Sequence, residues 1–298
     1  RHLGLIDKQV IDAVMAGLDW LLGLQNRDGG IPTFCRGWTA LPFDRSAPDL
    51  TAHTIGAISA WLDVVPISMH KRMVKAITSG LTYLKRVQNQ DGSWVPLWFG
   101  NQFAPNQENP LYGTARVLTA LCGSTTGGFN PAINCVTEPP VKLGAKYSIH
   151  LAPRFTWGPC FTRVSRFTRG YAPMINKAVR WLLSAQNQDG GWGRAKSTIE
   201  ETALAVDALA ELMLCGSLKR SLGMDYFRSA ISRGVSWLIE QTKQGTSVTA
   251  SPIGLYFARL WYFEELYPVI FTVSALQKVQ SILATDFTDF TEIHNKNY

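Results

Sequence analysis

The strongest constraint on this chain is an internal repeat, because one short motif recurs along it in the same order. In each copy an apolar, helix-like stretch runs into Gln, and in three of the four copies Asp-Gly follows shortly after. The copies contain Gln25, Gln88 and Gln186, and a degenerate fourth copy contains Gln241. The glutamines are 63, 98 and 55 residues apart. One repeat cannot bury its own apolar face, so the copies are expected to pack against one another.

Each copy predicts two helices. The first has apolar residues at helical spacing on one face and Lys, Arg or Asp on another, which is typical of an outer, amphipathic helix. Asp-Gly and Gly-Gly then break it, because glycine tolerates positive φ and has low helix propensity. The second helix is rich in Ala, Leu and Val, and these helices are expected at 49–62, 112–121, 201–214 and 267–282. No run of alternating strands is found, so we predict an all-α fold: one α/α toroid over residues 1–298, with apolar helices inside.

The polar residues of the motif are expected to have structural roles. Gln25, Gln88 and Gln186 would tie helix ends together. Asp28, Asp91 and Asp189 would accept hydrogen bonds from backbone N–H groups in the turns.

Residues 123–175 fit the helical pattern badly, since they contain Pro, Gly and Thr at the density of a loop. The range 139–188 holds eight Lys or Arg and no acid, whereas the whole chain has a net charge of +7. The remainder therefore carries −1, and the basic character belongs to one segment. An acidic partner such as anionic lipid or nucleic acid could meet it there. A solvated, irregular insert is the simpler interpretation, and we expect no nucleic-acid partner.

Composition excludes several classes of protein. Hydrophobic residues make up 46% of the chain and charged residues 17%, which excludes a disordered tail or a charged coiled coil. No uninterrupted apolar stretch reaches the ~18 residues of a membrane-spanning helix. Five cysteines without a C-x-x-C pair predict neither a disulfide framework nor a zinc knuckle, and they favour a reducing compartment.

Four segments together resemble the squalene-hopene and oxidosqualene cyclases. The repeat itself, with Gln, Asp-Gly and Trp, resembles the QW repeat of that family. Further matches are Trp98-Phe-Gly with Leu111-Tyr-Gly-Thr, Asp189-Gly-Gly-Trp-Gly with Ser197-Thr and Thr202-Ala, and Phe43-Asp-Arg-Ser-Ala-Pro-Asp-Leu-Thr-Ala at the place of the family's acidic motif. The resemblance covers nearly all of the chain except 123–175. It implies the catalytic C-terminal barrel of a two-barrel protein, and the N-terminal barrel of the same chain is expected as a missing partner.

The resemblance implies acid-initiated cyclisation of squalene or oxidosqualene. Such chemistry needs a proton donor and aromatic faces that stabilise carbocations without bonding to them. Asp49 is the candidate acid, and it follows Pro48 at the start of a helix. A helix N-terminus favours the carboxylate, whereas burial favours the neutral acid. A helix-capping Asp without chemistry is the structural alternative.

Two further residues are predicted to act beside Asp49. His53 lies one turn later on the same helix face and could hydrogen-bond the carboxyl group, although a merely packed or solvated histidine is the alternative. Tyr112 matches the tyrosine of the Y-G-T segment, which faces the cations in the family. Ala47 and Leu50 replace the flanking acids of hopene-type enzymes. The lone acid is therefore nearer to the epoxide-cyclising type.

Aromatic residues are the candidates for lining the substrate site, and core packing is the alternative for each of them. The candidates are Phe43, Trp38, Trp98, Trp192 and Phe263. Aligning Pro268 with the proline that follows the family's tyrosine pair places Leu260 and Phe263 at those tyrosines. Both hydroxyls are then absent.

Several alternatives stay open. Glu200 and Glu201 begin the third inner helix, where a carboxylate could deprotonate a cation or complement the helix dipole. The chain could be a non-catalytic isoprenoid-binding homologue, or a protein prenyltransferase-like transferase. The cyclase hypothesis requires no cofactor and no metal. It implies a polyprenoid substrate and a monotopic, cytoplasmic-side contact with a membrane, and otherwise a cytoplasmic protein.

Overall fold

The computed structural model describes residues 7–33, 44–62, 65–122, 171–214, 224–255 and 260–294. The helices alternate between outer and inner positions, as the repeat predicts. The outer helices are α1 (Lys8–Leu24), α3 (Ile67–Val87), α6 (Ala172–Ser184) and α8 (Met224–Gln241). The inner helices are α2 (Pro48–Ser59), α4 (Pro110–Cys122), α7 (Ile199–Leu214) and α9 (Leu266–His294). The all-α fold class is confirmed, and the inner helices begin within two residues of their predicted starts.

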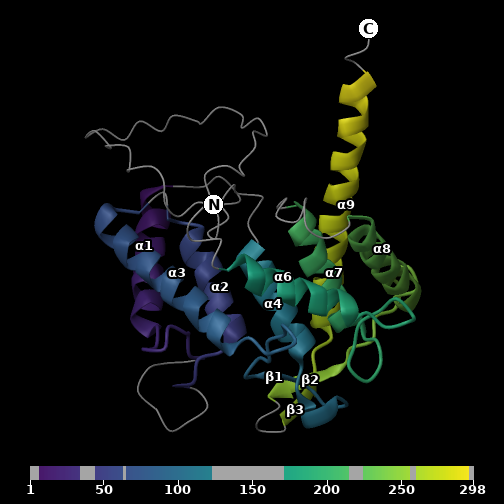
Figure 1. The fold of residues 1–298 in the computed structure, drawn as a ribbon, viewed down its shortest axis with the longest axis horizontal. Coiled ribbons are helices and arrows are strands. Elements are labelled where there is room, and N and C mark those ends of the chain that lie inside the picture. The colour runs from purple at the N-terminus through teal and green to yellow at the C-terminus, as the bar shows by residue number, and fades with distance from the viewer. Residues whose placement is uncertain are drawn as a thin grey trace.

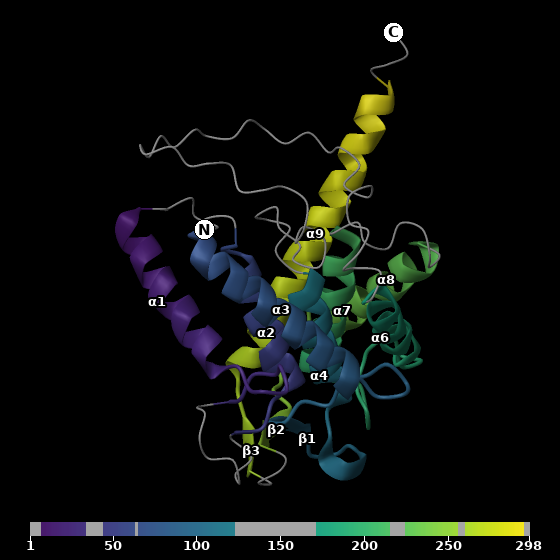
Figure 2. The same ribbon diagram turned by 60° about the vertical axis from the view of Figure 1, so that its left-hand side comes forward.

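The inner helices form the core of the molecule. Every residue of α7 from Ile199 to Leu212 is buried, whereas α3 buries only one face. The inner helices pack in the order α2, α4, α7 and α9, and each of the first three also contacts an outer helix. Figures 1 and 2 show this succession, with α9 projecting beyond the other helices. This alternation of outer and inner helices agrees with the predicted α/α toroid class.

The repeat loops make the same contacts three times. The side-chain amide of Gln25 donates to the backbone oxygens of Gly29 in its own loop and of Ala76 in the next outer helix, both at 2.9 Å. Gln88 and Gln186 repeat this arrangement in the second and third loops. The aspartate of each loop accepts from a backbone N–H two residues later at 2.9 to 3.0 Å. The structural roles predicted for these residues are confirmed.

A small antiparallel sheet departs from the expectation of no strands. It consists of β1 (Phe99–Asn101), β2 (Pro252–Leu255) and β3 (Leu260–Phe263), in that order. The pairs Gly100–Gly254 and Gly254–Trp261 set its register. The strands have only three or four residues, which is too short for an alternating pattern to be recognised. The sheet directly precedes α9 in the chain and lies near the start of α4 (Figure 1).

Most of the predicted insert lies outside the described residues, which exclude 123–170. Helix α6 begins at Ala172, so the last four residues of the predicted range 123–175 are helical. Within the part of the chain that the structure describes, no helix combines the length and apolar character needed to cross a membrane.

Candidate active site

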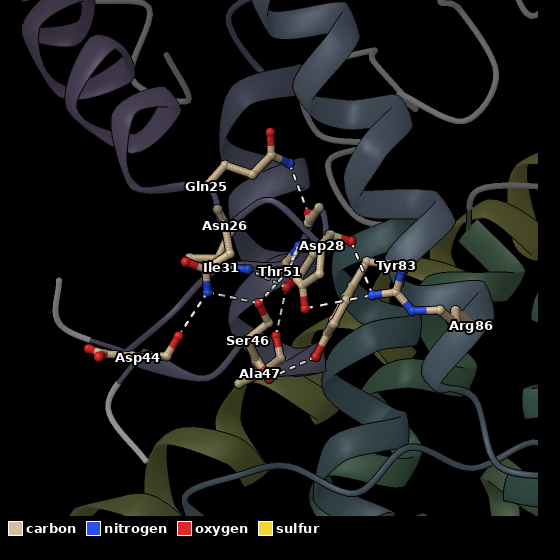
Figure 3. Close-up of polar contacts among 12 residues, drawn as sticks. Gln25, Asn26, Asp28, Ile31, Asp44, Ser46, Ala47, Thr51, Tyr83 and Arg86 are labelled. Carbon is tan, nitrogen blue, oxygen red and sulfur yellow. Dashed lines mark hydrogen bonds and ion pairs between the residues drawn. The ribbon is translucent and has the colours of Figure 1, made fainter. Parts of the chain in front are cut away.

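The first repeat loop fixes the start of α2, where the candidate acid lies (Figure 3). Ser46 donates its hydroxyl to the Asp28 carboxylate at 2.7 Å, and its backbone oxygen accepts from the Tyr83 hydroxyl at 2.7 Å. The Ala47 N–H donates to the backbone oxygen of Ile31 at 3.0 Å. Pro48 then begins the helix, with its fixed φ suited to a first turn. The backbone that carries Asp49 is therefore held from both sides.

Asp49 is a buried carboxyl group. Its side chain lies in the first turn of α2, and the residue is only 3% exposed. Oδ1 is buried and has no hydrogen-bond partner among the described residues. Burial raises the pKa of Asp49 to about 6, against the opposing effects of the Leu50 and Asp49 backbone N–H groups and of the Arg116 charge. Burial therefore has a larger effect on the pKa of Asp49 than the helix N-terminus has.

The structure brings Tyr112 and an arginine near Asp49. Tyr112 lies in the first turn of α4, and its ring stacks on Phe99 of β1 with centroids 4.4 Å apart. Arg116 lies one turn later, 5.4 Å from the Tyr112 ring centroid and 4.7 Å from that of Phe271 in α9. We call Asp49, His53, Tyr112, Arg116 and Phe271 the acid cluster.

His53 differs from its predicted role. Its side chain is exposed, and no hydrogen bond joins it to Asp49 among the described contacts. Partial desolvation of the imidazole ring, followed by the Arg116 charge, lowers the pKa of His53 to about 4. The imidazole is therefore neutral at neutral pH, and an effect on Asp49 through a direct hydrogen bond is not observed.

Asp49, Tyr112 and one glutamate occupy equivalent positions in the repeat. A backbone N–H of each repeat loop donates to a threonine hydroxyl of the following inner helix at 2.9 Å; these threonines are Thr51, Thr114 and Thr202. Asp49, Tyr112 and Glu200 each lie two residues before that threonine. The three inner helices thus present an acid, a phenol and a second acid at one level.

The two glutamates of α7 have different surroundings. The Glu200 carboxylate accepts from the N–H and the hydroxyl of Ser251, at 2.6 and 2.8 Å, so it anchors the segment before β2. Glu201 accepts from Asn101 and Thr198 through Oε2, each at 3.1 Å, whereas its buried Oε1 has no partner among the described residues. Burial raises the pKa of Glu201 to about 7.

The predicted lining residues have different positions. Trp38 and Phe43 lie outside the described residues. The Trp98 side chain is 6% exposed and donates its indole N–H to the Thr33 hydroxyl. Phe263 lies on the edge strand β3 and is 66% exposed. Roles for Trp98 and Phe263 in substrate binding stay predictions.

Trp192 requires a correction. It is completely buried, and its indole N–H donates to the Leu182 backbone oxygen of α6 at 2.8 Å. It also lies against Gly234 of α8, where an added Cβ would approach its ring to 2.7 Å. Trp192 therefore packs between helices and presents no surface to a substrate.

Two cavities are outlined by described residues, and Asp49 lines neither of them. One is an open depression of about 440 Å³ on α8, and the other is a void of about 10 Å³ between α1, α2 and α3. Within the described residues, no group of three or more His, Cys, Asp and Glu side chains is arranged to hold a metal ion.

Comparison with known proteins assigns the family. The model of the squalene-hopene cyclase C-terminal domain matches residues 5–137 and 163–281. The chain belongs to the squalene-hopene cyclase family. The interruption in the match falls inside the predicted insert. The match includes all five residues of the acid cluster.

Individual relatives agree with this family assignment. A probable squalene-hopene cyclase of Sinorhizobium fredii is 27% identical and aligns with 96% of this chain, and enfumafungin synthase of Hormonema carpetanum is 24% identical over 84% of it. The chain spans only 38% and 16% of these two relatives. The structure of ent-copalyl diphosphate synthase from Streptomyces platensis matches 87% of this chain and 37% of its own, with a TM-score of 0.55 and 20% identity, and this likeness shows the fold.

Sequence reasoning missed Arg116 and Phe271. Arg116 follows Tyr112 by four residues, so its position on the same helix face was available as a signal. Phe271 comes from α9, and only the tertiary packing of α4 and α9 brings it over Arg116.

Proposed function

We propose that the chain is the proton-donating barrel of a terpene cyclase that acts on squalene or its epoxide. The observation that carries this proposal is the state of Asp49: a buried carboxyl with one unpartnered oxygen, beside the aromatic rings of the acid cluster. The family assignment supports it, because the relatives named above include a squalene-hopene cyclase. The recurring Gln and Asp contacts support interpreting the repeat loops as QW repeats.

The proposed first step transfers one proton. The O–H bond of Asp49 breaks, and a new bond to hydrogen forms at the terminal alkene carbon or at the epoxide oxygen. The positive charge passes to the substrate, and Asp49 becomes a carboxylate. With a pKa of about 6, about one Asp49 in ten is protonated at pH 7. The rings of Tyr112, Phe99 and Phe271 would stabilise the carbocation through their π faces.

Turnover by Asp49 variants tests this proposal. The full chain would be incubated with squalene or oxidosqualene, and the products would be separated by gas chromatography with mass detection. We expect Asp49→Asn to lower turnover by about a hundredfold or more, because an amide cannot supply the proton. Asp91→Asn is the matched control, since Asp91 acts only as a hydrogen-bond acceptor in a repeat loop. An unchanged product yield for Asp49→Asn would exclude Asp49 as the acid.

We also propose that an apolar stripe on α9 contacts a lipid surface, from which a polyprenoid substrate would arrive. The stripe consists of Leu266, Val269, Ile270 and Val273, which are 61, 41, 54 and 50% exposed. Their spacing puts them on one face of the helix, and Leu260 and Phe263 of β3 are exposed nearby in the chain. Glu264 and Glu265 precede the stripe, so the contact should not require anionic lipid.

Sedimentation with phosphatidylcholine vesicles tests the lipid contact. We expect the chain to pellet with the vesicles, and the double variant Leu266→Ser, Ile270→Ser to pellet several-fold less. Leu283→Ser is the control, because Leu283 is 55% exposed on the same helix but lies off the stripe. Equal sedimentation of all three proteins would contradict the proposal.

A further inference from the structure

Arg116 is held between two aromatic rings inside the acid cluster. Its guanidinium carbon lies 5.4 Å from the Tyr112 ring centroid and 4.7 Å from the Phe271 ring centroid. Tyr112 is itself fixed by stacking on Phe99. Cation–π contacts of this kind restrict the guanidinium without neutralising its charge. Arg116 is therefore a charged residue whose guanidinium is held in place between a ring of α4 and a ring of α9.

Arg116 and Asp49 have complementary unsatisfied atoms. The Arg116 Nε is buried without a hydrogen-bond partner among the described residues, and the Asp49 Oδ1 is in the same condition. No carboxylate of the described residues forms an ion pair with Arg116. Buried unsatisfied groups of this kind are costly, and in native proteins they often mark functional positions.

The other titratable groups around Asp49 are uncharged at neutral pH. They are His53 on α2, Tyr83 on α3 and Tyr112 on α4. Burial raises the pKa of both tyrosines, to about 12 for Tyr112, and the pKa of His53 is lowered to about 4. Among the described side chains, Arg116 is the charged one that lowers the pKa of Asp49.

We propose that Arg116 is the positioning residue for proton transfer, and that it supplies the counter-charge for the carboxylate formed when Asp49 loses its proton. This inference rests on the function proposed above. As the Asp49 O–H bond breaks, its electron pair stays on the carboxylate oxygen, and the guanidinium stabilises the new negative charge. Arg116 does not receive or donate a proton.

The proposed interaction of Arg116 with the Asp49 carboxylate also explains how a guanidinium can lie near a developing carbocation. A lone positive charge there would repel the substrate cation. Once Asp49 is a carboxylate, the charges of Arg116 and Asp49 sum to zero, so the pair repels the substrate cation only weakly. The repulsion is therefore smallest after the proton has moved, which favours the transition state over the ground state.

The first test measures ionisation without turnover. The carboxyl pKa of Asp49 would be followed by carbon NMR on the full chain labelled at aspartate Cγ, with Asp49→Asn identifying the resonance. We expect Arg116→Met to raise this pKa by about one unit, and Arg116→Lys to restore most of the difference, because lysine keeps the charge. Arg86→Met is the matched control, since Arg86 lies 5.6 Å from the Tyr83 ring centroid but on the surface. An Asp49 pKa that is the same in Arg116→Met and the unaltered chain would overturn the proposal.

The second test is kinetic. In Arg116→Met we expect kcat to fall about tenfold with KM little changed, and the pH profile to shift with the pKa of Asp49. Thermal unfolding of each variant separates this effect from a loss of fold. Equal losses of kcat in Arg116→Met and Arg116→Lys, without a shifted profile, would assign Arg116 a packing role. Inactivity of the unaltered chain would instead contradict the proposed function and leave the NMR result to decide the coupling.

Discussion

At the scale of single residues, Asp49 is costly for the folded protein whenever it is ionised. Its pKa is raised from 3.8 to about 6 by burial, so the folded state binds the proton more tightly than the unfolded chain does. The stability that this proton provides is complete below pH 3.8 and is lost as the pH rises through 6. Above that range the ionised group costs about 3 kcal/mol, at 1.36 kcal/mol for each unit.

We therefore predict that Asp49→Asn stabilises the chain at high pH. The free energy of unfolding of the variant, minus that of the unaltered chain, should increase by about 2.4 kcal/mol between pH 4 and pH 8. Urea unfolding at a series of pH values measures this difference. A difference that is independent of pH would show that Asp49 ionises freely in the folded state.

The same residues show what a sequence can predict about a site. Asp49 could be chosen as a candidate because its segment resembles the acidic motif of the family, and Pro48 placed it at the start of a helix. Its burial was decided by the arrangement of α2, α3 and α4, which local sequence does not determine. Arg116 was missed because its importance depends on Phe271, which is 155 positions away in the chain.

At the scale of elements, a close contact explains the glycine that follows Tyr112. Gly113 lies in the first turn of α4, against the backbone that follows the second repeat loop. A Cβ at this position would lie 2.3 Å from the Trp94 backbone oxygen and 2.8 Å from Pro96 Cδ. A backbone atom cannot move aside as a flexible side chain can, so the helix and the loop would have to separate.

Two glycine substitutions test this explanation. Gly113→Ala is expected to lower the free energy of unfolding by about 2 kcal/mol. Gly17→Ala, in the middle of α1 with no atom within 4 Å of the added Cβ, is expected to raise it by about 0.5–1 kcal/mol. Chemical denaturation measures both. The explanation fails if the two substitutions have effects of the same sign.

The elements also differ in how far they could be predicted. The inner helices were found because apolar residues recur over three or more turns between Gly or Pro signals. The sheet was missed because its strands have only three or four residues and because β1 pairs with β2 from about 150 residues away, and Gly254 adopts a φ of 150° within it. The pairing of β1 with β2 has no local signal.

At the scale of the whole molecule, a charge cluster with two buried carboxylates joins the last two inner helices. Lys278 of α9 lies 2.8 Å from the carboxylates of Asp207 and Glu211 on α7. The Ser274 hydroxyl donates to Asp207 at 2.6 Å, and Thr119 of α4 donates to it at 3.4 Å. Burial alone would lower the pKa of Lys278, but the two carboxylates raise it above its ordinary value. The cluster therefore lies within the packing of α9 on α7, which is the most extensive between the described helices.

We predict that the cluster holds α9 in place but contributes little net stability. Lys278→Met should lower the free energy of unfolding by about 3 kcal/mol, because it removes the cation that the buried carboxylates of Asp207 and Glu211 share. The triple variant Lys278→Met, Asp207→Leu, Glu211→Met should recover most of this loss, since apolar side chains of similar volume avoid the desolvation cost. Urea unfolding gives the energies, and hydrogen exchange of α9 amides shows whether the helix detaches first. A triple variant as unstable as Lys278→Met would show instead that the charges themselves stabilise the packing of α9 on α7.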